Sequence, residues 1–288
     1  LNGLHDDLQS AYKSGSSTET ALLRIKADLE AGLDEGDAVL LVLLDLSAAF
    51  DTIDPTLLLE RLREEVGLRD TALQWVKSYL TDRSQAVKIN DSVSSDVPFS
   101  TGVPQGSVLG PLLFIIYIND LPKCIPLLKV ILFADDTSCL YRARNDSELF
   151  STLNSQLERL ADFFGANKLS LNVRKTRSMA FLPHDCHFHY QDILLDNEEV
   201  TWIKPDSPNT ETCYKFLGVL LDPGLTFKEH ISKISGKLSS AIFAVASSQK
   251  VLPRKVVLGV YRALFESHML YCCAAWGSAR PKLLLPLH

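Results

Sequence analysis

Three aspartates that end or interrupt apolar segments are the residues of this chain best suited to chemistry. Asp45 ends the apolar run 38–44, and the adjacent pair Asp135 and Asp136 interrupts the apolar segment 130–141. Because Asp favours turns for backbone reasons, the pair alone indicates no more than a hairpin tip. If Asp45 lies beside it, three like charges meet, and such a cluster is unfavourable unless protons or cations enter it.

Two kinds of chemistry fit a carboxylate cluster. Hard oxygen ligands favour Mg²⁺ or Mn²⁺, and two such ions about 3.5–4 Å apart can hold the attacking and leaving oxygens of a phosphoryl displacement. The alternative is acid–base chemistry by a carboxylate pair, as in glycoside hydrolysis. That alternative leaves the glycine-containing loop 102–107, Phe50 and the basic C-terminal region unexplained, whereas phosphoryl transfer uses all three.

The strand before Asp45 and the hairpin with the aspartate pair must be neighbours for either chemistry. Residues 38–45 predict a strand that is apolar on both faces and exposes its carboxylate only at the end. The order strand, helices, hairpin, helix, strand indicates an α+β fold, with an antiparallel sheet and helices packed on one face. Asp45 and the tip of hairpin 130–141 can then meet on adjacent strands.

Periodicity and capping residues predict the remaining elements. Helices are expected at 18–32 with Thr18 as the cap, 54–67, 70–80, 108–119 with Ser107 as the cap, 145–165, and as two helices over 228–276 broken at Pro253. Further strands are expected as a hairpin over 86–99, a strand near 177–182, a looser pair near 190–203 and a strand-forming segment at 213–221.

Charge is distributed unevenly. The net charge is −6, with 14 Lys and Arg against 24 Asp and Glu in residues 1–160, and 15 against 11 in residues 161–288. Between positions 226 and 262, Glu229 is the only acidic residue among the basic residues of the segment. A basic segment on an acidic body can bind phosphates, although a solvated helix face explains the same pattern.

Composition places further bounds on the protein. A length of 288 residues allows two or three lobes, and no apolar run reaches the roughly 18 residues needed to span a bilayer. Six cysteines without paired spacing favour reduced thiols in an intracellular compartment. Since the sequence starts at Leu1 rather than Met, we expect it to be part of a longer chain.

Five short segments carry the most specific pattern. They are Asp45–Asp51 (DLSAAFD), Gly102–Phe114 (GVPQGSVLGPLLF), Phe133–Asp136 (FADD), Asn167–Thr176 (NKLSLNVRKT) and Phe216–Gly218 (FLG). In this order they resemble the successive palm motifs of reverse transcriptases, most closely those of LINE-type (non-LTR) retrotransposons. Each motif alone is weak to moderate, whereas five in the family's order are very specific.

The resemblance implies a right-hand polymerase with an antiparallel-sheet palm (a ferredoxin-like core), partial fingers and a helical thumb. The implied boundaries are partial fingers over 1–37, a palm over 38–222 with finger segments at about 54–101, and a truncated thumb over 223–288. The implied function is that of an RNA-directed DNA polymerase core serving retrotransposition. Its partners would be an RNA template, a DNA primer or target and dNTPs, without a membrane, in an intracellular ribonucleoprotein of cytoplasm and nucleus.

The resemblance also assigns the aspartates. Asp45, Asp135 and Asp136 would be catalytic, and with the main-chain carbonyl of Leu46 they would hold two Mg²⁺ ions, with Mn²⁺ as a substitute. The primer 3′-hydroxyl would attack the α-phosphate of the incoming nucleotide and release pyrophosphate.

Other matched positions are implied to contact nucleotide or nucleic acid. Phe50 would stack under the deoxyribose and crowd a 2′-hydroxyl, and Gln105 would touch the nascent base pair. Gly102 and Gly106 would let the backbone approach template and nucleotide closely. Lys175 would meet the triphosphate or protonate the leaving group. The implied primer grip and thumb contacts are Phe216, Leu217, Gly218, Lys228, Lys233, Lys237, Arg254 and Lys255.

Several features depart from the family pattern. Where the family has Gln-x-Gly-Phe-Arg in its fingers, this chain has Gln9–Lys13 (QSAYK), which loses a glycine and replaces Arg, the better bidentate phosphate ligand, by Lys. The finger strands that usually precede this motif are not in the sequence, and Arg177 stands where an acidic residue is common. Two alternatives therefore stay open: a catalytically decayed, polymerase-derived nucleic-acid-binding module, and a palm-type nucleotidyltransferase or cyclase that needs no template.

The segment 184–189 (HDCHFH) contains potential zinc ligands. Structural zinc sites need two separated ligand pairs, and no partner pair is evident. We interpret the segment as a polar surface loop.

Overall fold

A five-stranded sheet lies at the centre of the computed structural model, which describes residues 8–184, 186–205 and 211–287. The strand order is β13-β10-β1-β8-β7. The strands are β1 (Ala38–Leu44), β7 (Lys129–Phe133), β8 (Asp136–Ala143), β10 (Arg177–Phe181) and β13 (Thr201–Ile203). All neighbours are antiparallel except β10 and β13, which run parallel. The expected antiparallel sheet is therefore correct for four strands, and the fifth joins it through the long crossover that a parallel pair requires.

Four of these strands and two helical connections form the ferredoxin-like core that was predicted. The first connection, between β1 and β7, contains α2 (Pro55–Glu64), α3 (Asp70–Leu80), α4 (Gly110–Ile118) and α5 (Leu121–Cys124). The second, between β8 and β10, is α6 (Asp146–Ala166). This βαββαβ order gives the observed strand sequence β10-β1-β8-β7 and confirms the α+β class.

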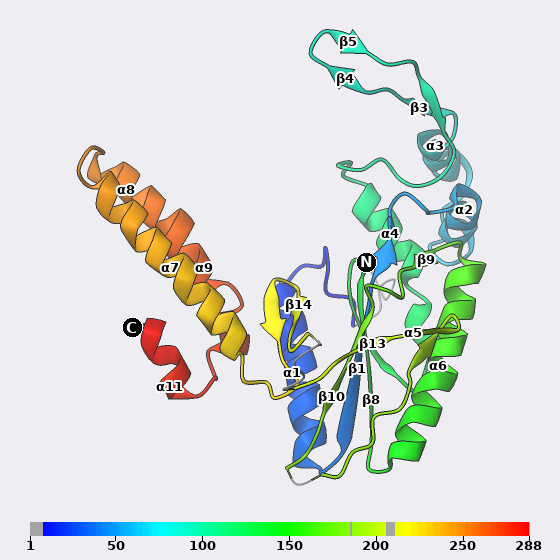
Figure 1. Ribbon diagram of the computed structural model, residues 1–288. Helices are drawn as coiled ribbons and strands as arrows, with labels where there is room; N and C mark the ends of the chain where they lie inside the picture. The colour runs from blue at the N-terminus through cyan, green and yellow to red at the C-terminus, as the bar shows by residue number, and fades with distance from the viewer. Residues whose placement is uncertain (1–7, 185, 206–210, 288) are drawn as a thin grey trace.

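Helices cover both faces of the sheet, so the expectation of helices on one face was wrong. Alternate residues of β1, from Ala38 to Leu44, pack into a core with α4 and α6, whereas Val39, Leu41 and Leu43 pack into a second core with α1 (Thr18–Asp34). Figure 1 shows α1 and α6 on opposite sides of β1. The cause lies in β1 itself, because a strand that is apolar at every position must be covered twice. The helix expected within the fingers therefore lies against the palm sheet.

Local capping explains where the helices begin. Ser17, rather than Thr18, is the N-cap of α1, since its hydroxyl accepts from the Thr20 N–H at 3.2 Å while the Thr20 hydroxyl accepts from the Ser17 N–H at 2.8 Å. The predicted Ser107 cap lies one turn before α4, where its Oγ accepts from the Gly110 N–H at 3.0 Å. The helix thus begins at Gly110 instead of residue 108.

In Figure 1 the hairpin arm that was predicted as a finger segment (the finger arm) extends to the upper right of this core, and the helices of the predicted thumb lie to its left. The arm pairs β3 (Arg83–Gln85) with β6 (Val97–Phe99) and β4 (Lys88–Ile89) with β5 (Ser92–Val93). The thumb consists of α7 (Lys228–Ser248), α8 (Arg254–Tyr261), a π-helical turn (Arg262–Glu266), α9 (Ser267–Leu270), α10 (Cys273–Trp276), α11 (Pro281–Leu284) and a 3-10 turn (Leu285–Leu287). The predicted break at Pro253 is confirmed.

Small strand pairs complete the described chain. They are β2 (Leu46–Ser47) with β9 (Ser170–Leu171), β11 (Leu194–Leu195) with β12 (Glu198–Glu199), and β14 (Tyr214–Phe216) with β15 (Val219–Leu221). No helix in the described ranges is long and apolar enough to cross a membrane.

Candidate active site

The three aspartates lie at one end of adjacent strands. Leu44, the last residue of β1, is opposite Thr137 of β8, and Phe133 of β7 is opposite Asp136. One further step of the β1–β8 register places Asp45 opposite Asp136, while Asp135 occupies the two-residue turn between β7 and β8. The register therefore brings together the residues that the sequence separates by 90 positions.

The turn that carries Asp135 has an unusual backbone. Ala134, its first residue, has φ +56° and is buried. A non-glycine residue in this left-handed region costs about 1–3 kcal/mol and persists only where surrounding contacts determine it. The aspartate turn is thus held in place by its neighbours.

The charges of the three carboxylates are coupled. Partial desolvation, followed by the charges of Asp135 and Asp45, raises the pKa of Asp136 from its ordinary value of 3.8 to about 6. Burial raises the pKa of the Tyr214 phenol on β14, and the negative charges of Asp45 and Asp136 raise it further. The carboxylates therefore form one electrostatic unit that extends to the β14–β15 hairpin.

Asp45 is fixed through its main chain by the segment around Asn172. Its carbonyl oxygen accepts from the Asn172 N–H at 2.9 Å, and its N–H donates to the Thr176 hydroxyl at 3.4 Å. The Thr176 hydroxyl in turn donates to the Asn172 carbonyl at 3.0 Å. Between them, Lys175 places its Nζ 3.9 Å from Asp45 Oδ2 with most of the side chain exposed. Among the ion pairs of the described residues, the pair between Lys175 and Asp45 brings a cation closest to a predicted catalytic carboxylate.

The donor set suits a hard divalent cation. Carboxylate oxygens, together with a main-chain carbonyl such as that of Leu46 after Asp45, are the ligands that Mg²⁺ and Mn²⁺ prefer. A cation would also relieve the repulsion by Asp135 and Asp45 that, after desolvation, raises the pKa of Asp136. Within residues 8–184, 186–205 and 211–287, however, no three His, Cys, Asp or Glu side chains already converge as a ligand group. Binding would therefore require the aspartate side chains to come closer together than in this structure.

The glycine-containing loop is tied to the turn after β2. The Val103 N–H donates to the Phe50 carbonyl at 2.9 Å, and the Gly102 N–H donates to the Ile53 carbonyl at 2.7 Å. A Cβ on Gly102 would lie 2.7 Å from the Asp51 Cα, so only glycine fits. The missing side chain of Gly102 thus makes room for the protein's own backbone, and its approach to template or nucleotide stays a prediction.

Gly106 differs from Gly102. Its φ is +77°, and no heavy atom lies within 4 Å of the position that a Cβ would take. Glycine is needed here for conformation, and the space beside it is open to a ligand.

Phe50 and Gln105 are each held by a contact within the protein. The Phe50 ring is half-buried and stacks on Phe114 with centroids 4.7 Å apart. The Gln105 Nε2 donates to both carboxylate oxygens of Asp51, at 2.9 and 3.0 Å, which leaves the Gln105 carbonyl oxygen available. A cavity of about 660 Å³ opens beside them, lined by Asp51, Gln105 and residues at the base of the finger arm such as Arg83.

The predicted primer grip is a tight turn rather than a cluster of side chains. Leu217 and Gly218 both have positive φ (+44° and +84°), and the Tyr271 hydroxyl donates to the Leu217 carbonyl at 2.8 Å. The Phe216 side chain is buried in the core beneath. The Phe216 side chain is therefore not available to a primer, and only the turn can contact one.

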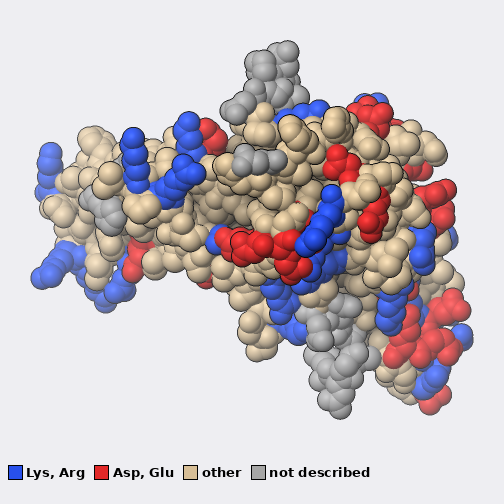
Figure 2. Space-filling model, turned by 90° about the horizontal axis from the view of Figure 1, so that it is seen from below, with Lys and Arg blue, Asp and Glu red and all other residues tan. Residues whose placement is uncertain are grey.

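The predicted thumb contacts lie on exposed helix faces. Lys228, Lys233 and Lys237 on α7, with Arg254 and Lys255 on α8, are exposed, and none forms an ion pair among the described residues. Figure 2 shows mostly basic side chains along the thumb, on the left, whereas acidic side chains gather over the body.

Arg177 and the segment 184–189 both make contacts within the protein. Arg177 pairs with Glu211 at 2.9 Å and donates to the Thr176 carbonyl. In the segment 184–189, Asp185 lies outside the described residues, and the His189 N–H donates to Asp146 Oδ2 at 3.0 Å.

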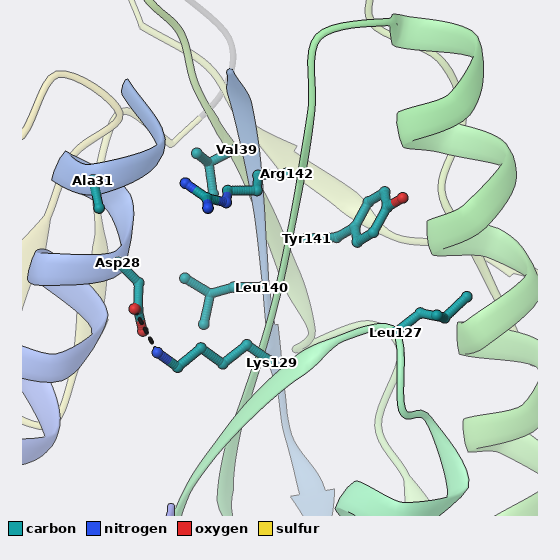
Figure 3. Close-up of a pocket in the computed structure, with 8 residues that line it drawn as sticks. All are labelled: Asp28, Ala31, Val39, Leu127, Lys129, Leu140, Tyr141 and Arg142. Atoms are coloured by element: carbon teal, nitrogen blue, oxygen red, sulfur yellow. Dashed lines mark hydrogen bonds and ion pairs between the residues drawn. The ribbon is translucent and has the colours of Figure 1, made fainter. Parts of the chain in front are cut away.

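A separate cavity of about 320 Å³ lies between α1 and the far ends of β7 and β8 (Figure 3). Lys129 pairs with Asp28 on one side, and Arg142, which pairs with Glu35 at 3.1 Å, lies on the other. At about 3.3 Å per residue, the cavity is roughly 13–20 Å along the strands from the aspartate turn. It is not part of the carboxylate site.

The fold and the order of these motifs are those expected of a reverse transcriptase, and comparison with known families agrees. The model of the family "Reverse transcriptase (RNA-dependent DNA polymerase)" matches residues 3–221. The chain belongs to this family, as the resemblance predicted.

The similar proteins come from mobile elements. The chain is 27% identical to the probable RNA-directed DNA polymerase from transposon X-element of Drosophila melanogaster, over 96% of this chain and 30% of that protein. It is 27% identical to the RNA-directed DNA polymerase from mobile element jockey of the same species, over 71% of this chain and 22% of that protein. It thus spans less than a third of either relative. Among solved structures, telomerase from Candida albicans, in complex with a telomeric RNA fragment, aligns with a TM-score of 0.49 and 12% identity, over 96% of this chain and 50% of that one.

Sequence reasoning assigned no role to three residues that contact the site or feel its charges. Asp51 orients Gln105, Thr176 binds the Asp45 main chain, and Tyr214 shares the field of the aspartates. Asp51 and Thr176 lie inside recognised motifs. Their polar side chains next to residues with an implied role could therefore have indicated that they belong to the site. Nothing local distinguishes Tyr214.

Proposed function

We propose that this chain is the polymerase core of an RNA-directed DNA polymerase from a LINE-type retrotransposon. It would add dNTPs to a primer 3′-hydroxyl under the direction of an RNA template. The observation that carries the proposal is the β1–β8 register, which puts Asp45 next to the aspartate turn; desolvation first, and then the charges of Asp135 and Asp45, raise the pKa of Asp136 there. The similarity to the probable RNA-directed DNA polymerase of X-element and to the RNA-directed DNA polymerase of jockey supports it.

Each residue of the carboxylate site would have its own role in the reaction. Asp45, Asp135 and Asp136, with the Leu46 carbonyl, would hold two divalent cations, which when bound supply electrostatic stabilisation of the pentavalent phosphorus and of the leaving oxygen. The primer 3′-hydroxyl would give its proton to solvent and its oxygen would bond to the α-phosphorus, while the bond from that phosphorus to the bridging oxygen would break and pyrophosphate would leave. Lys175, beside Asp45, would meet the triphosphate or give a proton to the pyrophosphate.

The nucleotide would lie between the carboxylates and the loop 102–106. The stack on Phe114 supports the Phe50 ring, which would crowd a 2′-hydroxyl that approaches it. The Gln105 carbonyl, oriented by Asp51, would accept from the nascent pair, and the open space at Gly106 would receive the nucleotide. The turn at Leu217 and the thumb lysines would contact the primer and its duplex, within an intracellular ribonucleoprotein.

Primer extension on an RNA template tests the proposal directly. Asp135→Asn with Asp136→Asn should abolish template-directed dNTP addition in Mg²⁺ and in Mn²⁺. Asp196→Asn, which neutralises an exposed aspartate in the β11–β12 turn, is the matched control and should retain full extension. Extension that survives the double substitution would exclude this site, and product that ignores the template sequence would indicate a template-independent transferase.

A second candidate is a nucleic-acid-binding module without turnover. It is favoured by the absence of a converged ligand group among the described residues and by the exposed thumb lysines. Salt-dependent RNA binding without nucleotide addition in either metal would establish it in place of the polymerase.

A further inference from the structure

The N-terminal segment of the described chain lies against the aspartate turn. The Leu132 N–H of β7 donates to the Leu8 carbonyl at 3.1 Å, and the Ser10 N–H donates to the Leu132 carbonyl at 2.8 Å. Gln9 lies between them, paired with Leu132 in a short parallel bridge. The segment that the resemblance placed in the fingers thus extends the edge of the palm sheet at its catalytic end.

The Gln9 side chain reaches the turn itself. Its Oε1 accepts from the Ala134 N–H at 3.3 Å and from the Ala11 N–H at 2.8 Å, and only 2% of the residue is exposed. Two main-chain N–H groups converge on one oxygen, so the amide carbonyl faces the turn. Nε2 has no hydrogen-bond partner among the described residues.

This contact acts on a residue with a strained backbone. Ala134 takes the left-handed conformation without being glycine, and Asp135 follows it directly. The Gln9 bond fixes the peptide plane before Ala134, and that plane sets the direction in which the chain continues to Asp135. Without the bond, the Ala134 N–H would be buried without its acceptor, and the turn would be free to relax toward an unstrained conformation.

We propose that Gln9 is a positioning residue that locks the aspartate turn in the conformation that presents Asp135 to divalent cations. The metal part of this proposal rests on the proposed function. Gln9 touches neither substrate nor metal, and it acts through the Ala134 main chain.

Two measurements on folded, nucleotide-free protein test the proposal. The first is amide hydrogen exchange at Ala134, and the second is the Kd for Mn²⁺ by electron paramagnetic resonance titration. Gln9→Met keeps the length of the side chain and removes the acceptor. Ser10→Ala is the matched control, because Ser10 is equally buried and its hydroxyl has no partner among the described residues.

We expect Gln9→Met to accelerate exchange at Ala134 and to raise the Mn²⁺ Kd, each by about two- to tenfold, which is the range set by losing one hydrogen bond. Ser10→Ala should leave both values unchanged. Exchange at Ala134 that is equal in the two variants would overturn the proposal, as would faster exchange with an unchanged Kd. If Gln9→Met does not fold, Gln9→Asn, whose shorter side chain withdraws the oxygen, takes its place under the same criteria.

The same titration separates this proposal from the proposed function. If Mn²⁺ binding to the wild-type chain survives Asp135→Asn with Asp136→Asn, the metal site fails, whatever Gln9 does. If the double substitution abolishes binding and Gln9→Met does not weaken it, only the role of Gln9 fails.

Discussion

Neutralising Asp136 should stabilise the protein when no metal is present. The pKa of Asp136 rises from 3.8 to about 6 on folding, through desolvation first and then repulsion by Asp135 and Asp45. Between these two values the folded state binds more protons than the unfolded state, so the free energy of unfolding falls as pH rises through this window. Above about pH 6 the loss is complete and constant.

The magnitude follows from the shift. About two pKa units at ~1.36 kcal/mol each give roughly 2.7 kcal/mol. Because the Asp136 side chain is exposed and screened by solvent, we reduce this to about 1 kcal/mol. For a chain of this size, Asp136→Asn should then raise Tm by roughly 2–4 °C at pH 7.5 and by almost nothing at pH 4.

Thermal unfolding in EDTA at low ionic strength, from pH 4 to 7.5, measures this effect, with Asp196→Asn as the charge-matched control. Mg²⁺ should raise Tm of the wild-type protein at pH 7.5 and should raise that of Asp136→Asn less, because ligand binding to the folded state stabilises it. A gain that is independent of pH, or one that the control reproduces, would refute the reasoning that the three aspartates share one site.

Three further predictions concern the nucleotide and the thumb. Phe50→Val should increase ribonucleotide incorporation relative to dNTPs in primer extension, and an unchanged ratio would contradict its role at the sugar. Lys175→Met should lower kcat by roughly 10²-fold if Lys175 protonates the leaving group, whereas an effect on KM alone would restrict it to binding. His230 is buried, its Nδ1 accepts from the Leu220 N–H, and desolvation followed by Lys233 and Lys237 lowers its pKa to about 4. As pH falls, His230 is therefore protonated in the unfolded state before it is protonated in the folded state. The free energy of unfolding should decrease as pH falls from about 6.5 to 4. His230→Asn should be less stable at pH 7 and should show a shallower decrease in Tm, and identical slopes would contradict this.

The sequence alone determined the elements and the order of the motifs. Helix caps, turn residues and apolar periodicity are local signals, so α2, α3, α6 and the break at Pro253 lie where they were predicted. Asp45 and the aspartate pair could be placed at strand ends because a carboxylate is costly inside a strand that is buried on both faces. The family resemblance depended on the same short segments.

Only the tertiary structure decided how these pieces meet. The pairing of Leu44 with Thr137, the second face covered by α1, the approach of Gly102 to Asp51 and the reach of Gln9 to Ala134 all join residues distant in sequence. No local propensity encodes such contacts, because they depend on register and on side-chain packing between elements. For the same reason the family resemblance placed Gln9 in the fingers, whereas the fold places it against the aspartate turn.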